Sequence, residues 1–109
     1  MSYIPNRGDI AWVDFDPIKG HEQGGKRPAF VVSSRVYNSK SHMALICPIT
    51  SKAKNYPFEV SIAIGKIKGV ILTDQVRNVD WVNRKMEFVG KVDVEIIKMV
   101  QNRLVRLVE

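Results

Sequence analysis

Cysteine is nearly absent from this chain of 109 residues, with Cys47 as its single example. One thiol excludes a disulfide framework and a thiolate metal cluster, and its neighbours Leu45 and Ile46 predict a small buried residue. No apolar run is long enough to predict a membrane span, and residues 1–5 lack the pattern of a signal peptide. We therefore expect one cytoplasmic domain, residues 1–109, large enough for a single hydrophobic core.

Acidic residues are also scarce, since 11 Asp and Glu stand against 17 Lys and Arg, which gives a net charge of +6. A surplus of this kind favours a polyanionic partner such as nucleic acid. Many small domains of similar charge bind no nucleic acid, however, and in them the charge serves solubility. Composition alone leaves both interpretations open.

The chain has no internal repeat, linker or low-complexity segment, and most of its apolar residues follow strand patterns. We predict seven strands, at residues 10–15, 28–33, 43–50, 58–64, 70–76, 79–82 and 86–92. Pro48 predicts that the third of these is an edge strand or carries a bulge, because proline cannot donate to a ladder.

Two other segments have different patterns. Residues 34–41 are polar and turn-rich, with room for one short helical turn, and residues 65–69 predict a hairpin turn. Residues 93–107 change to a helical period, with Val94, Ile97, Val100, Leu104 and Leu107 on one face and Asp93 as N-cap. Short strands followed by one helix predict a mainly β fold, either a small, strongly bent barrel or a sandwich.

The most polar stretch spans residues 19–30, with the sequence KGHEQGGKRPAF. It places His21, Glu22, Lys26 and Arg27 around two adjacent glycines, which are poor residues for the interior of a helix or strand. We therefore predict a loop, and a loop with acid, base and cation beside a rigid strand is typical of a catalytic site. The same residues would also suit a solvated hairpin tip without function.

Four blocks of the sequence resemble the MazF/PemK (Kid) toxins of bacterial toxin–antitoxin pairs. The first is GDIAWVDFDPIKGHEQGGKRPAFVVS, from Gly8 to Ser33, which resembles the N-terminal signature of that family. The others are Pro48–Ser51, Tyr56–Val60 and Leu72–Arg77, in the same order as in the family. The resemblance covers essentially the whole chain, including the terminal helix.

The resemblance implies a small SH3-like barrel of five to seven short antiparallel strands with a C-terminal helix. It implies a sequence-specific endoribonuclease that cleaves single-stranded mRNA without metal or cofactor and so inhibits translation and growth. The implied partners are RNA, a second copy in a homodimer, and a cognate antitoxin with an acidic tail. DNA would be contacted only indirectly, through the antitoxin, and no membrane is implied.

Carried over by position, the resemblance implies three catalytic residues, Arg27, Thr50 and Glu22. Leu72 stands where some members have an arginine, and His21 matches only the PemK-like branch. In the implied reaction the 2′-OH attacks its own 3′ phosphate, which requires a base, an acid and a cation against the phosphate oxygens. Arg27 suits the cation role and Thr50 can donate a hydrogen bond to the phosphate. The base is left open among Glu22, His21 and Asp74.

Further residues are candidates for RNA binding, because they carry positive charge, aromatic surface or base-reading groups in or near predicted loops. They are His21, Lys26, Lys52, Lys54, Tyr56, Asp74, Gln75, Arg84 and Lys85. The basic members would form one groove if their loops cluster on one face. Phe15, Tyr56 and Trp81 could stack on unpaired bases, although Phe15 also suits the core.

Two alternatives to a nuclease remain. A toxin similar to CcdB would act on a protein target through a C-terminal Trp-Gly-Ile, but residues 106–109 read RLVE. The second alternative is a passive RNA-binding barrel. No His, Cys or Asp cluster has the spacing of metal ligands, so we predict no metal site.

Overall fold

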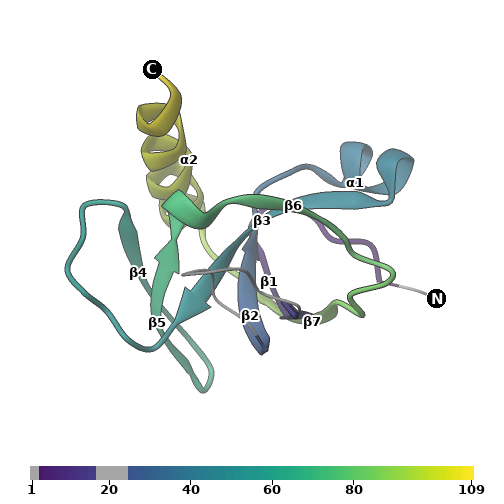
Figure 1. The fold of residues 1–109 in the computed structure, drawn as a ribbon, viewed down its shortest axis with the longest axis horizontal. Helices are drawn as coiled ribbons and strands as arrows, with labels where there is room; N and C mark the ends of the chain where they lie inside the picture. The colour runs from purple at the N-terminus through teal and green to yellow at the C-terminus, as the bar shows by residue number, and fades with distance from the viewer. Residues whose placement is uncertain (1–2, 17–24) are drawn as a thin grey trace.

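The computed structural model describes residues 3–16 and 25–109, in which strands predominate (Figure 1). In chain order the elements are β1 (Asp9–Asp14), β2 (Lys26–Val31), α1 (Arg35–Ser41), β3 (Met43–Thr50), β4 (Glu59–Ile64), β5 (Ile67–Leu72), a 3₁₀-helix (Thr73–Gln75), β6 (Arg77–Asp80), β7 (Glu87–Lys91) and α2 (Val94–Val108).

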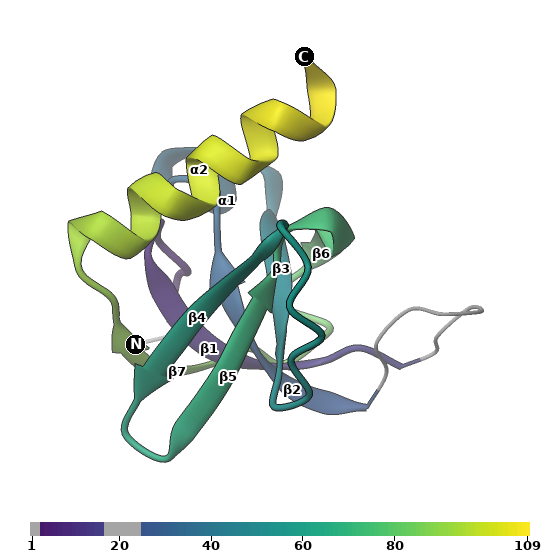
Figure 2. The ribbon, with the colours of Figure 1, turned by 90° about the vertical axis from the view of Figure 1, so that its left-hand side faces the viewer.

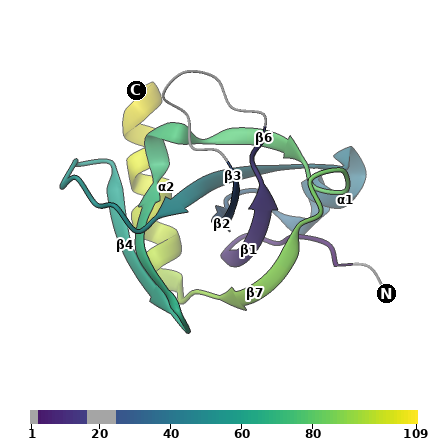
Figure 3. The same cartoon turned by 60° about the horizontal axis from the view of Figure 1, so that its bottom comes forward.

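The described strands form one antiparallel sheet of seven strands. Its order is β4-β5-β3-β2-β1-β7, and β6 pairs with β3 beside this path. The sheet curves so strongly that its outer strands, β4 and β7, approach one another (Figure 3). Where they meet, the side chain of Ile64 in β4 packs on Gly90 in β7. The predicted mainly β fold with a bent antiparallel sheet and a terminal helix is therefore confirmed.

Strand β3 occupies the centre of the sheet, so the prediction of an edge strand or bulge at Pro48 was wrong. Along one side β3 pairs with β2, with Ala29 opposite Pro48. Along the other side it pairs with β6 as far as Ile46 and with β5 from Ile49 onward. Pro48 lies between these two partners, where β3 exchanges one neighbour for the other. A central strand accommodates proline there because neither β6 nor β5 pairs with that residue.

The predicted strand at residues 70–76 ends early, because a 3₁₀-helix replaces its last part. Strand β5 stops at Leu72, and the buried Thr73 then turns the chain. Both the N–H and the Oγ1 of Thr73 donate to the carbonyl oxygen of Phe58, at 3.3 and 2.5 Å. The β5 strand also begins earlier than predicted, at Ile67, so the preceding hairpin turn is short. The other strand boundaries agree with prediction within two residues.

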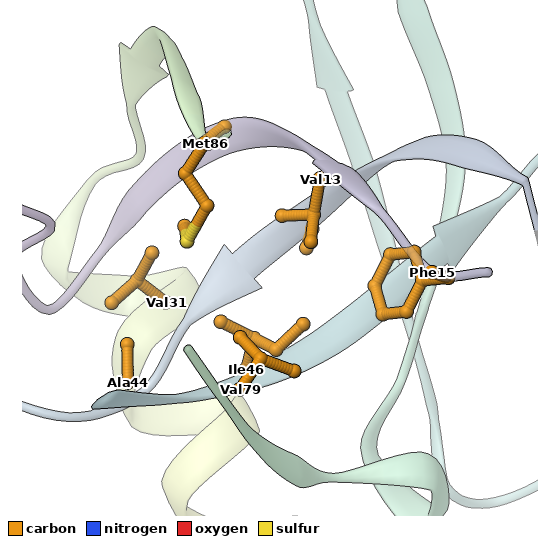
Figure 4. Packing of buried hydrophobic residues seen from close by; sticks show 9 residues of the cluster. Val13, Phe15, Val31, Ala44, Ile46, Val79 and Met86 are labelled. Atoms are coloured by element: carbon orange, nitrogen blue, oxygen red, sulfur yellow. The ribbon is translucent and has the colours of Figure 1, made fainter. Parts of the chain in front are cut away.

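The described residues bury two apolar clusters rather than the single core that we expected. The first includes Val13, Val31 and Ile46, and it lies on one face of β1, β2 and β3 (Figure 4). The second includes Ile10 and Phe30, on the opposite face of the same strands. Alternate residues of a strand point to opposite faces, so these strands are covered on both sides. This arrangement explains the nearly continuous apolar sequence of β2.

Helix α2 covers the second cluster and stands against one side of the sheet (Figure 2). The predicted N-cap is confirmed, since Asp93 Oδ1 accepts a hydrogen bond from Ile96 N at 3.2 Å. Val100 is fully buried, but Val94 and Leu107, the ends of the predicted apolar stripe, are exposed. Neither helix of the described chain is long and apolar enough to cross a membrane.

Asn38 of α1 is fully buried and ties three segments together. Its Nδ2 donates to the carbonyl oxygens of Pro5 at 2.7 Å and Ser33 at 3.1 Å, and its Oδ1 accepts from the Ser33 hydroxyl. Asn38→Ala should therefore lower the free energy of unfolding by about 3 kcal/mol, because it leaves buried polar groups without partners. Urea denaturation measures this. Ser39→Ala, on the exposed side of the same helix, is the control and should stay within about 0.5 kcal/mol of wild type; equal stability of the two variants would contradict the prediction.

Candidate active site

Many of the predicted site residues line a small hollow beside the end of β3. We call it the Thr50 hollow; its volume is about 80 Å³. Its lining comes from β3, from the following loop and the first residue of β4, and from the end of β5 with the following 3₁₀-helix. The lining residues are Thr50, Lys52, Lys54, Tyr56, Glu59, Leu72, Asp74 and Gln75. The structure thus brings together residues that are far apart in the sequence, with Thr50 among them.

Thr50 is held firmly at the end of its strand. It is only 5% exposed, and its Oγ1 accepts a hydrogen bond from Lys52 N at 3.2 Å. Strand β5 lies directly against it, and a Cβ added at Gly69 would overlap the backbone oxygen of Thr50. Glycine at position 69 is therefore required for the close approach of β5 to β3.

A larger hollow of about 430 Å³ lies on the other side of the end of β3, and we call it the Arg27 hollow. Ile49 and Ser51 line this hollow, whereas Thr50 between them lines the smaller one. The complete lining is Trp12, Gly25, Lys26, Arg27, Pro28, Ile49, Ser51, Lys66, Ile67 and Lys68. The two hollows therefore flank the same strand end.

Arg27 and Thr50 come from neighbouring strands. The two strands are antiparallel, with Ala29 opposite Pro48, so the start of β2, which carries Arg27, and the end of β3, which carries Thr50, lie at the same end of the pair. Arg27 lines one of the two hollows that flank this end, and Thr50 lines the other. Glu22 and His21, the other predicted loop residues, lie outside the described residues.

Sequence reasoning missed Lys66 and Lys68, which line the Arg27 hollow. Both lie within the hairpin turn predicted at residues 65–69; the structure keeps Lys66 in the turn but places Lys68 in β5. The local pattern does not indicate which strand that hairpin lies against. The strand order places β5 next to β3, which brings this pair of lysines to the site. Trp12 is only partly buried and also lines the Arg27 hollow.

Arg84 and Lys85 do not join either hollow, so the predicted single groove of loop cations was wrong in this part. Arg84 Nη1 donates to the backbone oxygens of Asp14 at 2.9 Å and Asp16 at 2.7 Å, which anchors the end of β1. Lys85 lines a separate hollow with Trp81. A turn between β6 and β7 carries both residues away from the end of β3.

Only one of the three aromatic residues proposed for base stacking is well placed for it. Phe15 is fully buried in the first cluster, under the guanidinium of Arg77 at 5.7 Å from its ring centre. Trp81 is partly buried, and its Nε1 donates to Asn38 O at 2.9 Å. Tyr56 is 55% exposed and lines the Thr50 hollow.

The buried thiol beneath the site is not suited to nucleophilic chemistry. Burial, and to a smaller extent the negative charge of Asp74, raises the pKa of Cys47 to about 12. The thiolate is the reactive form of cysteine, so Cys47 stays inert at neutral pH. Among residues 3–16 and 25–109, no group of three or more His, Cys, Asp or Glu side chains is arranged to hold a metal ion.

Comparisons with known proteins agree on one family. Residues 6–108 match the PemK-like, MazF-like toxins of type II toxin–antitoxin systems. The endoribonuclease toxin MazF of Escherichia coli strain K12 is 43% identical over 102 residues, which cover 94% of this chain and 92% of MazF. The crystal structure of MazF from Deinococcus radiodurans has a TM-score of 0.92 and 39% identity, covering 97% of both chains. A MazE–MazF crystal structure from D. radiodurans has a TM-score of 0.86 and 39% identity, covering 97% of this chain and 96% of the other. The chain therefore belongs to the family of PemK-like, MazF-like toxins.

Proposed function

We propose that this protein is an endoribonuclease toxin that cleaves single-stranded RNA. The observation that supports this function most directly is the antiparallel pairing of β2 with β3, because it brings the strand ends that carry Arg27 and Thr50 to the same end of the sheet, beside two lysine-lined hollows. The E. coli relative, which is an endoribonuclease toxin, supports the same activity.

The proposed reaction is an internal transfer at phosphorus. The 2′-oxygen forms a bond to its adjacent phosphorus, the bond from phosphorus to the 5′-oxygen breaks, and a cyclic phosphate and a 5′-hydroxyl result. Arg27 would hold two phosphate oxygens with its permanently charged, planar guanidinium. Thr50 would donate a hydrogen bond to the same phosphate. Glu22, His21 and Asp74 are the candidates for the base that takes the 2′-OH proton and for the acid that gives a proton to the leaving 5′-oxygen.

RNA would enter along the end of β3, where both hollows offer positive charge. Lys26, Lys66 and Lys68 would contact phosphates on one side of the strand, and Lys52 and Lys54 on the other. Tyr56 would stack on an unpaired base. Asp74 and Gln75 would read base edges, because both line the Thr50 hollow.

We also propose two protein partners. A homodimer would extend the RNA-binding surface beyond one small barrel. A cognate antitoxin, supported by the MazE–MazF structure, would lay an acidic, partly disordered tail over the lysines of the two hollows and compete with RNA. Light scattering measures the molar mass and so tests the dimer. Competition between labelled RNA and an acidic antitoxin peptide tests whether both bind the same surface. If the RNA and the peptide bind at the same time, they do not compete.

A cleavage assay with the purified protein tests the proposed activity. We expect cleavage of a single-stranded RNA in the presence of excess EDTA, with 5′-hydroxyl products. The Arg27→Ala variant prepared in parallel controls for a contaminating nuclease. Binding without cleavage would favour the passive RNA-binding alternative, and neither binding nor cleavage would favour a toxin that acts on a protein target. Cleavage that EDTA abolishes and magnesium restores would indicate a different mechanism.

A further inference from the structure

The loop of residues 51–58, between β3 and β4, carries three of the side chains that line the Thr50 hollow. They are Lys52, Lys54 and Tyr56. All three are exposed, and two of them carry the same charge, so their own packing does not determine the shape of the loop. Contacts from residues elsewhere must hold it.

Glu59, the first residue of β4, supplies such contacts to the middle of the loop. Its Oε1 and Oε2 accept hydrogen bonds from Lys54 N at 3.1 and 3.0 Å, and Oε1 also accepts from Asn55 N at 2.9 Å. Asn55 has a φ of 60°, a left-handed conformation that is uncommon for residues other than glycine. The carboxylate thus binds two successive backbone N–H groups at a tight turn, an arrangement that suits an anion.

Other residues hold the end of the same loop. The Thr73 hydroxyl donates to Phe58 O at 2.5 Å, and Arg103 Nε of α2 donates to Pro57 O at 2.8 Å. Because these contacts lie after Tyr56, removal of Glu59 would leave the end of the loop attached. The turn at residues 54 and 55 would lose its carboxylate partner.

We propose that Glu59 is a positioning residue, which presents Lys54 and Tyr56 to the substrate by fixing the turn at residues 54 and 55. This inference rests on the proposed endoribonuclease function. The carboxylate is committed to backbone amides, and Arg27 and Thr50 carry the proposed chemistry, so Glu59 acts through the loop. Orientation of binding groups before the substrate arrives lowers the entropic cost of binding.

Steady-state kinetics of RNA cleavage tests this role. Glu59→Ala should raise KM about tenfold and change kcat by less than about threefold, because substrate binding loses its ordered loop while Arg27 and Thr50 remain. Glu59→Gln keeps an oxygen that accepts both N–H groups and should stay within about threefold of wild type. The control is Glu95→Ala in the first turn of α2, which removes the same charge at an exposed position and should behave as wild type. A Gln variant as impaired as the Ala variant would assign Glu59 a charged role at the substrate and overturn the proposal.

A double-mutant cycle with Lys54 separates positioning from a general loss of structure. Lys54→Ala should raise KM in the wild-type background but change it by less than about twofold in the Glu59→Ala background, because the lysine is already misplaced there. Independent, multiplicative effects of the two substitutions would overturn the proposal.

Amide hydrogen exchange gives a readout that does not depend on nuclease activity. In Glu59→Ala the amides of Lys54 and Asn55 should exchange faster, whereas those of β4 and β5 should be unchanged. Unchanged exchange at both residues would refute the anchoring role even in an active enzyme. If exchange is faster in Glu59→Ala but the wild-type protein cleaves no RNA, Glu59 still anchors the loop and the proposed nuclease function is refuted.

Discussion

Arg27→Ala should lower the rate of RNA cleavage by about a hundred- to a thousandfold while the protein remains folded. The expected loss is large because the guanidinium would neutralise negative charge that develops on the phosphate during the transfer. The neutral side chain of alanine cannot do this. Arg27 is partly exposed, near the start of β2, and the apolar residues that hold β2 in the sheet follow it. Single-turnover cleavage of a saturating RNA measures the chemical step.

Two variants sharpen this test. Arg27→Lys keeps a positive charge but loses the planar pair of donors, so it should fall between wild type and Arg27→Ala. Arg106→Ala, on the exposed side of α2, removes the same charge away from both hollows and should leave cleavage unchanged. Near-normal turnover by folded Arg27→Ala would contradict the assignment of Arg27 to the reaction.

An RNA with a single 2′-deoxynucleotide at the scissile position should bind normally and resist cleavage completely. The proposed nucleophile is the 2′-oxygen, so its removal abolishes the reaction but keeps the phosphates that Lys52 and Lys54 would contact. Fluorescence anisotropy measures the affinity, and gel electrophoresis measures the products. A deoxynucleotide one position away serves as the matched substrate and should be cleaved.

The position of the deoxynucleotide also tests the reaction path. Cleavage of the substituted bond at a rate near that of all-RNA would mean that water, and not the 2′-OH, attacks the phosphorus. That result would be compatible with the roles proposed for Arg27 and Thr50 at the phosphate, but it would exclude a base that acts on the 2′-OH.

Local patterns predicted most elements of this fold, because their physical causes are local. Alternation along residues 58–64 and the N-cap at Asp93 depend on neighbouring residues alone, and both agree with the structure. The 3₁₀-helix after Leu72 was missed because it depends on a hydrogen bond from Thr73 to Phe58, fifteen residues earlier. The prediction at Pro48 was wrong because β3 tolerates a proline where its partner changes from β6 to β5. The local sequence does not show which strands pair with β3.

The residues of the candidate site also fall into two groups, those that the sequence identified and those whose position depends on strand order. The resemblance led to Thr50, and positive charge in a predicted loop led to Lys52 and Lys54; the structure brings all three into one hollow. Charge alone made Arg84 a candidate for RNA binding, but the structure uses its guanidinium for backbone carbonyls near the end of β1. Lys66 had the same charge and the same loop position, yet it reaches the site. Sequence does not distinguish two such residues, because strand order decides where each loop points.

Gly69 limits how this toxin can be redesigned. Any side chain at this position would overlap the backbone of Thr50, so position 69 tolerates no substitution beside the candidate site. An engineer seeking a new RNA target would therefore vary the rim, at residues 52–56 and 66–68, where side chains are mostly exposed. If Thr50 acts as proposed, the fold would separate a constant position for bond breaking from variable positions that select the RNA.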